Sequence, residues 1–251
     1  LNAPAQDWAR ARLENSPRHL EWVKVKHGTR EVNCFLAFPE IKDKAAAVVL
    51  IHEIFGLTDW VRGVADQLAE AGYIAIAPDL LSGAAPGGGG TAELGTGDAV
   101  RKAIAALPPD QITADLRAVV AHVAALPACN GKVAVAGFCW GGSETFRFAT
   151  NAREPKAFFV FYGSGPSAEA ELARVQAPVY GFYGGNDARV NATIPATAEV
   201  MKKLGKRFEP VIYEGAGHGF MRAGEAPDAS EANRKARAEA WARWKALLQG
   251  L

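Results

Sequence analysis

Three residue types that together perform nucleophilic catalysis occur along the chain in the order Cys139, Asp187 and His218. A free thiol is mostly protonated near neutral pH, and a histidine within hydrogen-bond reach can accept its proton. An aspartate behind the imidazole fixes its tautomer and stabilises the imidazolium that forms. If the fold brings these side chains together, they predict acyl transfer through a covalent intermediate on the thiol.

Cys139 lies at the centre of the hexapeptide Gly137–Gly142 (GFCWGG), which follows the apolar run 132–136. The pattern Gly-x-Cys-x-Gly is that of a nucleophile elbow, in which a strand reverses sharply into a helix, with cysteine where serine is usual. The flanking glycines permit the tight turn, which forces the central residue into a strained conformation. Taken alone, the segment fits a buried cysteine beside a glycine turn equally well.

Asp187 and His218 each follow a strand-like run, at 180–183 and 211–214 respectively. In open α/β sheets, functional sites gather at the carboxyl ends of strands. Each residue alone has a simpler interpretation, as a turn-forming aspartate and a solvated loop histidine. All three at strand ends, in the order nucleophile, acid and base, favour the triad of α/β-hydrolases.

Apolar runs alternate with amphipathic segments, which predicts an α/β fold: a mostly parallel central sheet with helices on both faces. Strands are expected at 45–51, 73–77, 132–138, 157–162, 179–183 and 209–213, with a strand pair at 21–38 around Gly28. Helices are expected near 111–126, 142–150 and 196–204, and in a segment that Asp59 caps and Gly72 ends. A last amphipathic helix, 230–248, places Trp241, Trp244, Leu247 and Leu248 on its apolar side.

Two segments depart from this alternation. The polar residues 1–20 are expected to form an N-terminal extension with a short helix anchored by Trp8 and Leu13, and 21–251 to form a single domain. The segment 82–96 contains four consecutive glycines and is expected to be a flexible loop, either a flap over the site or a surface excursion.

Composition limits the partners. The net charge is +1, with no run of five like charges, which argues against nucleic acid or an anionic membrane as a partner. No apolar stretch is long enough to span a bilayer. We therefore expect a soluble protein, a monomer or weak homo-oligomer, whose partner is a small molecule. We expect a cytoplasmic location. If a leader was removed before Leu1, the expected location is periplasmic or extracellular.

The chain has three cysteines, Cys34, Cys129 and Cys139, and no two are spaced as in a zinc or thioredoxin-like site. We expect neither a metal nor a cofactor. Cys34, in a strand-like segment, and Cys129, in a turn, are expected to be structural thiols; a disulfide between them is the alternative in an oxidising compartment.

The strand 45–51 runs into His52-Glu53-Ile54-Phe55-Gly56. In the α/β-hydrolase arrangement, the loop after this strand and the residue after the nucleophile donate the backbone N–H groups of the oxyanion hole. The expected donors are the amides of Ile54 and Trp140. Glu53 then points into the site beside Cys139, where it opposes thiolate formation unless it accepts the thiol proton. The alternative is a surface carboxylate.

At these positions the chain resembles the dienelactone hydrolase (carboxymethylenebutenolidase) family of the α/β-hydrolase superfamily. The resemblance covers roughly residues 21 to 249 and is carried by 52–56 (HEIFG), 77–80 (APDL), 137–142 (GFCWGG), 162–163, 185–187 and 218–220. It implies the α/β-hydrolase fold and hydrolysis of an enol-lactone whose ring also carries a carboxylate.

The resemblance also implies roles for individual residues. In the resting enzyme the neutral thiol would turn toward Glu53, which takes its proton when substrate displaces the carboxylate. Arg222, four residues after His218, would hold the substrate carboxylate through paired hydrogen bonds. Phe55 and Tyr162 are expected to contact the substrate.

The chain departs from the family at a second arginine, which family members carry in the loop after Asp79-Leu80. Residues 81–88 contain no arginine here, and Arg62 and Arg101 are the candidate substitutes. A single arginine is compatible with a looser preference for lactones and small esters. Two alternatives therefore stay open: a broader carboxylesterase or thioesterase on the same triad, and a non-catalytic thiol sensor or binder on the same fold.

Overall fold

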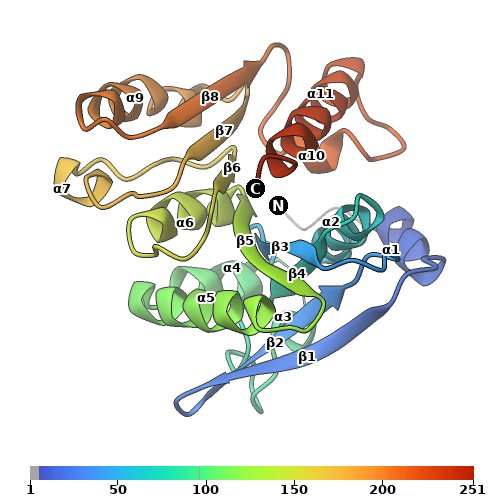
Figure 1. The fold of residues 1–251 in the computed structure, drawn as a ribbon. Helices are drawn as coiled ribbons and strands as arrows, with labels where there is room; N and C mark the ends of the chain where they lie inside the picture. The colour runs from blue at the N-terminus through green and yellow to red at the C-terminus, as the bar shows by residue number, and fades with distance from the viewer. Residues whose placement is uncertain (1–5, 96) are drawn as a thin grey trace. The chain divides into compact units, whose positions relative to one another are not determined.

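The computed structural model describes residues 6–95 and 97–251 and divides the chain into two compact units, 1–133 and 134–251 (Figure 1). Each unit consists of strands covered by helices. The expectation of a single domain over 21–251 stays a prediction.

The strands of the first unit follow the order β1-β2-β4-β3. β1 pairs with β2 and β2 with β4 in antiparallel fashion, whereas β3 and β4 are parallel. Their bounds are Leu20–His27 (β1), Arg30–Ala37 (β2), Ala45–Ile51 (β3) and Ile74–Pro78 (β4). The helices are Asp7–Glu14 (α1), Asp59–Glu70 (α2), Thr91–Leu94 (α3), Asp98–Ala105 (α4) and Pro109–Ala124 (α5). Every residue of β3 and β4 is buried, because α2 and α5 lie on opposite faces of these strands.

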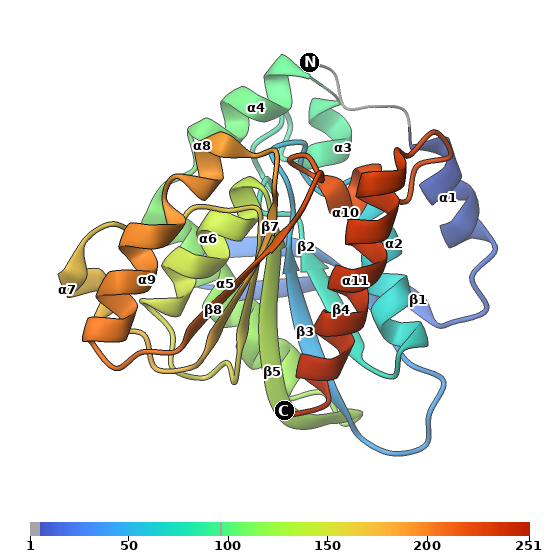
Figure 2. The same ribbon diagram turned by 90° about the horizontal axis from the view of Figure 1, so that it is seen from above.

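The strands of the second unit follow the order β5-β6-β7-β8, and all of them are parallel. The bounds are Cys129–Phe138 (β5), which begins in the first unit, Phe158–Phe161 (β6), Val179–Gly184 (β7) and Phe208–Tyr213 (β8). The helices are Trp140–Ala149 (α6), Glu169–Leu172 (α7), Ala188–Asn191 (α8), Ile194–Lys203 (α9), Phe220–Ala223 (α10) and Glu231–Leu248 (α11). Figure 2 shows α6 and α9 on one face of these strands and α11 on the other.

The predicted α/β class, with mostly parallel strands and helices on both faces, is therefore confirmed. Two details of the helices differ from what the sequence predicted. Thr58 is the N-cap of α2, and Asp59 is its first residue, where a negative charge still favours the helix dipole. Along α11 the buried positions are Ala236, Ala240, Trp244 and Leu248, whereas Trp241 and Leu247 are only half-buried.

The N-terminal segment is attached to the first unit through α2. The carboxylate of Asp66, on α2, is fully buried and accepts hydrogen bonds from Arg18 Nε at 2.6 Å and Ser16 Oγ at 2.6 Å. In α1 the buried residue is Ala9; Trp8 and Leu13, the expected anchors, are half-buried. The extension is therefore held to α2 by the hydrogen bonds to Asp66, with a small apolar contribution from Ala9.

The glycine-rich segment, expected to be a loop, contains the short helix α3. Thr91, its first residue, donates from its amide to Asp79 Oδ2 at 2.7 Å and from its hydroxyl to Asp79 Oδ1 at 2.8 Å. A side chain on Gly90 would place its Cβ 2.4 Å from Asp79 Oδ2, so this position requires glycine. Asp79 thus ties residues 90–91 to the end of β4. A role for 82–96 as a flap stays a prediction, and residue 96 lies outside the described residues.

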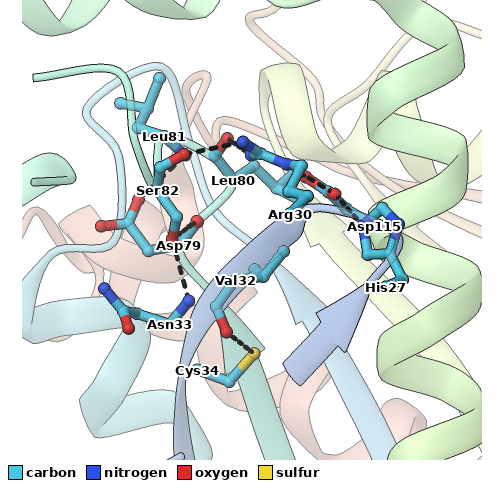
Figure 3. A network of polar contacts seen from close by, with 10 residues as sticks. All are labelled: His27, Arg30, Val32, Asn33, Cys34, Asp79, Leu80, Leu81, Ser82 and Asp115. Carbon is cyan, nitrogen blue, oxygen red and sulfur yellow. Dashed lines mark hydrogen bonds and ion pairs between the residues drawn. The ribbon is translucent and has the colours of Figure 1, made fainter. Parts of the chain in front are cut away.

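A buried charged network lies beneath the loop that follows β4 (Figure 3). Asp115, on α5, accepts two hydrogen bonds from Arg30 Nε, at 2.8 and 2.9 Å, and lies 2.6 Å from His27 Nε2. The same guanidinium donates to Ser82 O at 2.8 Å and Leu80 O at 3.1 Å. A buried carboxylate is stable only when paired and hydrogen-bonded, and here Arg30 links it to the β1–β2 hairpin and the β4 loop.

Candidate active site

Cys139 lies at a strained turn between β5 and α6. Its φ of 57° is in the left-handed region, which costs a non-glycine residue on the order of 1–3 kcal/mol. The neighbouring glycines make the turn sterically feasible. A Cβ on Gly137 would lie 2.1 Å from Gly141 O, and one on Gly142 would lie 2.5 Å from Phe161 O. The expected nucleophile elbow is thus present in its geometry, with the thiol at the N-cap of α6.

The three predicted triad side chains form one hydrogen-bonded row. His218 Nε2 lies 3.1 Å from Cys139 Sγ, and His218 Nδ1 lies 2.5 Å from Asp187 Oδ2. The Asp187 side chain is 6% exposed and that of His218 35%. Since the carboxylate accepts from Nδ1–H, Nε2 is the ring nitrogen available to take the thiol proton. In this arrangement the thiol points at His218, unlike the turned-away resting thiol that the resemblance implies.

The position of the thiol at the start of α6 adds an electrostatic contribution. The N-terminal end of a helix carries partial positive charge, which favours an anion over a neutral group there. Trp140, the expected second oxyanion donor, is the first residue of the same ten-residue helix. The amide of Trp140 therefore lies at the end of α6 that favours negative charge, and its role as an oxyanion donor stays a prediction.

Tyr162 is the second of two non-glycine residues with positive φ in the described part of the chain, with a φ of 42°. It follows β6, and its amide donates to Phe182 O at 2.8 Å. Its ring is 1% exposed and packs edge-on against His218, with 5.2 Å between ring centroids, and against Phe220 at 5.5 Å. The ring of Tyr162 thus packs against the imidazole of His218, and its expected contact with substrate stays a prediction.

The segment 52–56 forms a tight turn in the first unit. Gly56 N donates to Glu53 O at 3.1 Å, and His52 Nδ1 lies 2.8 Å from the same carbonyl oxygen. Burial lowers the pKa of His52, so its neutral form is favoured in the folded protein. Glu53 is 1% exposed, so the alternative of a surface carboxylate is wrong. The roles expected of Glu53, Ile54 and Phe55 toward the Cys139 site stay predictions.

This turn is held by Thr91, which the sequence interpretation did not single out. Thr91 Oγ1 accepts the amide of Leu57 at 3.0 Å while donating to Asp79. Gly56 has a φ of 75°, and a Cβ there would lie 2.3 Å from Thr91 Oγ1. The glycine of the HEIFG segment is therefore required by both its backbone conformation and its close approach to Thr91.

The candidate arginines differ in their surroundings. Arg62 forms an ion pair with Asp59, and its guanidinium lies over the rings of Trp22 and Phe35, 5.6 and 5.5 Å from their centroids. Arg101 forms an ion pair with Asp98. Both candidate substitutes for the second arginine are thus engaged by carboxylates of their own helices. Arg222 lies on α10, one turn beyond His218, and is half-buried.

The other cysteines are free thiols, so the alternative of a Cys34–Cys129 disulfide is wrong. Both are buried, and burial raises the pKa of the Cys34 thiol to about 12. Across residues 6–95 and 97–251, no group of three or more histidine, cysteine or acidic side chains is arranged to hold a metal ion. None of the helices in that part of the chain has the length and apolarity to span a bilayer.

Comparison with known proteins places this geometry in a family. A family model described as the dienelactone hydrolase family matches residues 32–251. The chain belongs to the dienelactone hydrolase family. Its α/β-hydrolase fold is shared with the crystal structure of a Klebsiella pneumoniae protein named “Putative Dienelactone Hydrolase”. That protein is 25% identical, with a TM-score of 0.80 over 93% of this chain and 99% of the other.

Curated relatives of the family are similar at about the same level along most of the chain. A Methylorubrum extorquens protein named “Putative carboxymethylenebutenolidase” is 30% identical over 79% of this chain and 71% of its own length. A Synechocystis protein of the same name is 30% identical over 90% of this chain and 95% of its own length. Membership of this dienelactone hydrolase family supports a hydrolase of the ester or lactone type.

The environments of the three thiols predict selective chemistry at Cys139. Iodoacetamide added to the native protein near neutral pH should modify Cys139 alone, because Cys34 is fully buried with a raised pKa and Cys129 is 4% exposed. Peptide mass spectrometry measures the modification at each site, and Cys139→Ser is the control for the label. In urea all three thiols should react. Comparable labelling of Cys34 in the native protein would contradict this assignment.

Proposed function

We propose that the protein hydrolyses a lactone or ester through an acyl-enzyme on Cys139, with His218 as the proton acceptor and donor and Asp187 as its orienting carboxylate. The observation that carries the proposal is the hydrogen-bonded row of the three side chains at a strained elbow. A sensor thiol does not need an oriented base, so this row also favours hydrolysis over a non-catalytic sensor or binder.

The proposed reaction has two stages, acylation of the thiol and hydrolysis of the acyl-enzyme. His218 Nε2 takes the thiol proton, and the thiolate attacks the carbonyl carbon of the substrate. The amides of Ile54 and Trp140 stabilise the resulting oxyanion. The bond to the leaving oxygen breaks, the enolate or alkoxide takes the proton from His218, and the acyl group stays on sulfur. Water, deprotonated by His218, attacks this thioester and releases the acid and the free thiol.

Glu53 is proposed as the proton acceptor for the other orientation of the thiol, turned away from His218. Glu53 is 1% exposed, and a carboxylate held away from bulk water can act as the acceptor for the proton of a neighbouring thiol. When substrate displaces it, Glu53 receives the proton and the thiolate returns to the triad. Either route produces the same nucleophile.

Arg222 is proposed to bind a carboxylate on the substrate, which places the activity near that of carboxymethylenebutenolidases. A guanidinium binds a carboxylate through two charge-assisted hydrogen bonds. Arg222 is assigned to this role because it lies on α10, one turn beyond His218, where the family resemblance expects the carboxylate-binding arginine. A broader carboxylesterase or thioesterase activity on the same triad is favoured instead by the arginine-free loop 81–88.

The covalent step predicts the behaviour of Cys139 variants. Cys139→Ala should lower hydrolysis of a lactone or aryl ester by at least about 10³-fold, because no nucleophile remains. In the unmodified protein, acid quenching during turnover should trap an adduct whose mass equals the acyl group, assigned to Cys139 by peptide mass spectrometry. Turnover that persists in Cys139→Ala would show that the covalent mechanism is wrong.

The proton-acceptor role predicts that Glu53→Gln slows acylation on the order of 10²-fold in single-turnover experiments, since glutamine cannot accept the thiol proton. The folded state should persist, as judged by circular dichroism. Glu40→Gln, at an exposed position of the same unit, is the matched control and should acylate at the unmodified rate. An unchanged acylation rate in Glu53→Gln would show that Glu53 is not the acceptor of the thiol proton.

The substrate class is tested with a pair of compounds, a carboxylated enol-lactone and an uncharged aryl ester. Arg222→Ala should lower kcat/KM for the carboxylated lactone by about 10- to 100-fold, the value of a charge-assisted hydrogen bond, and leave the uncharged ester nearly unaffected. Arg189→Ala, at an exposed position on α8, is the control. A strong preference for the uncharged ester that Arg222→Ala does not change would replace the dienelactone-type assignment with the broader esterase.

A further inference from the structure

The loop that carries His218 is rich in glycine and therefore has little conformational preference of its own. Residues 215, 217 and 219 are glycines, and Gly215 and Gly219 have φ values of 72° and 78°. Glycine-rich backbone has more accessible conformations than any other, so a loop of this composition depends on contacts from outside. The placement of His218 therefore has to come from neighbouring elements.

One such contact comes from the first turn of α11. Asn233 Oδ1 accepts the backbone N–H of Gly217 at 2.9 Å, immediately before His218. The backbone amide of Asn233 in turn donates to Ser230 Oγ, the N-cap of α11, at 3.2 Å. A Cβ on Gly215 would lie 3.3 Å from the Cβ of Ala232, so the loop packs closely against this turn.

The other contacts come from the residue next to Asp187. Asn186 donates from its backbone amide to Ala216 O at 2.9 Å and from Nδ2 to Gly215 O at 3.0 Å. Residues 215, 216 and 217 are therefore each held by one hydrogen bond from outside the loop. Asn186 couples the histidine loop to the aspartate loop, and Asn233 couples it to α11.

α11 is itself anchored on the strands of the second unit. Trp244 is fully buried, and its ring packs 4.8 Å from that of Phe161 on β6. Arg243 donates to Gly181 O at 2.7 Å and to Glu209 O at 2.9 Å, on β7 and β8. The helix is thus held by the strands that precede Tyr162 and Asp187, which makes its first turn a rigid support.

We propose that Asn233 is a positioning residue for His218. Through Gly217 it holds the imidazole so that Nε2 stays at 3.1 Å from Cys139 Sγ while Nδ1 stays on Asp187. A proton transfer between side chains requires their heavy atoms to remain within hydrogen-bond reach, and a displacement of about 1 Å can cost on the order of 10²-fold in rate. This inference rests on the proposed triad chemistry and adds to it the element that keeps the base in place.

Two variants and a matched control separate positioning from general stability. Asn233→Ala removes the acceptor, Asn233→Asp keeps a side-chain oxygen there, and Ser230→Ala removes the N-cap of the same helix turn while leaving Asn233 in the chain. The first readout is the pH profile of iodoacetamide reaction at Cys139, which needs no substrate. The second is kcat and KM on a hydrolysed ester, with stability followed by urea unfolding.

Asn233→Ala should move the alkylation profile toward that of an isolated thiol, at higher pH, and lower kcat by about ten-fold or more with little change in KM. Asn233→Asp should keep the alkylation profile and kcat close to those of the unmodified protein, because a side-chain oxygen remains to accept the Gly217 amide. Ser230→Ala should destabilise the protein by about 1 kcal/mol and keep the unmodified pH profile.

An unchanged alkylation profile in Asn233→Ala would overturn the inference, and so would an equal shift in Ser230→Ala. The failure of the proposed function looks different. In that case the alkylation profile would still shift in Asn233→Ala, but no lactone or ester would be turned over by the unmodified protein.

Discussion

The candidate site depends on one steric constraint, the close approach of α6 to the strands beside it. Cys139 can adopt a φ of 57° only because Gly137 and Gly142 lack the Cβ atoms that would meet Gly141 O and Phe161 O. A Cβ on Gly163 would likewise lie 2.3 Å from the amide nitrogen of Ser143 on α6. The glycines thus allow α6 to begin directly after Cys139, which places the positive end of the helix at the thiol.

The strain at this turn is stable because the surrounding structure is fixed independently. The strands that lead into Cys139, Tyr162 and Asp187 are parallel neighbours with buried aromatic side chains between them and α11, among them Phe161 and Trp244. Side chains that start from neighbouring carboxyl ends need only short loops to meet. The loop with His218 is the exception, since it follows the outer strand β8 and is rich in glycine, and it requires hydrogen bonds from Asn186 and Asn233.

The sequence was sufficient for the fold class and for the meeting of Cys139, Asp187 and His218. Buried parallel strands such as β3 and β4 read as continuous apolar runs. Cys139 and Asp187 follow buried strands of this kind, whereas His218 follows β8, an outer strand that is only partly buried. The contacts that hold the loops were not predictable in the same way. Asp115 and Arg30 are 85 residues apart, and Thr91 and Leu57 are 34 apart. Polar residues that pair over such long separations leave no pattern in the local sequence from which the contact could be predicted. The glycine run before α3 carries no local signal of the ordered contact that follows it, because Asp79, the partner of Thr91, lies 12 residues earlier in the chain.

The network around Asp115 also fixes the guanidinium of Arg30. Arg30 lies beneath the loop after β4, where it donates to Ser82 O and Leu80 O, but its charge is already balanced by Asp115. A guanidinium that is paired and desolvated in this way cannot turn to a ligand without leaving Asp115 as an uncompensated buried charge, a cost of several kcal/mol. The contacts of Arg30 with this loop are therefore structural.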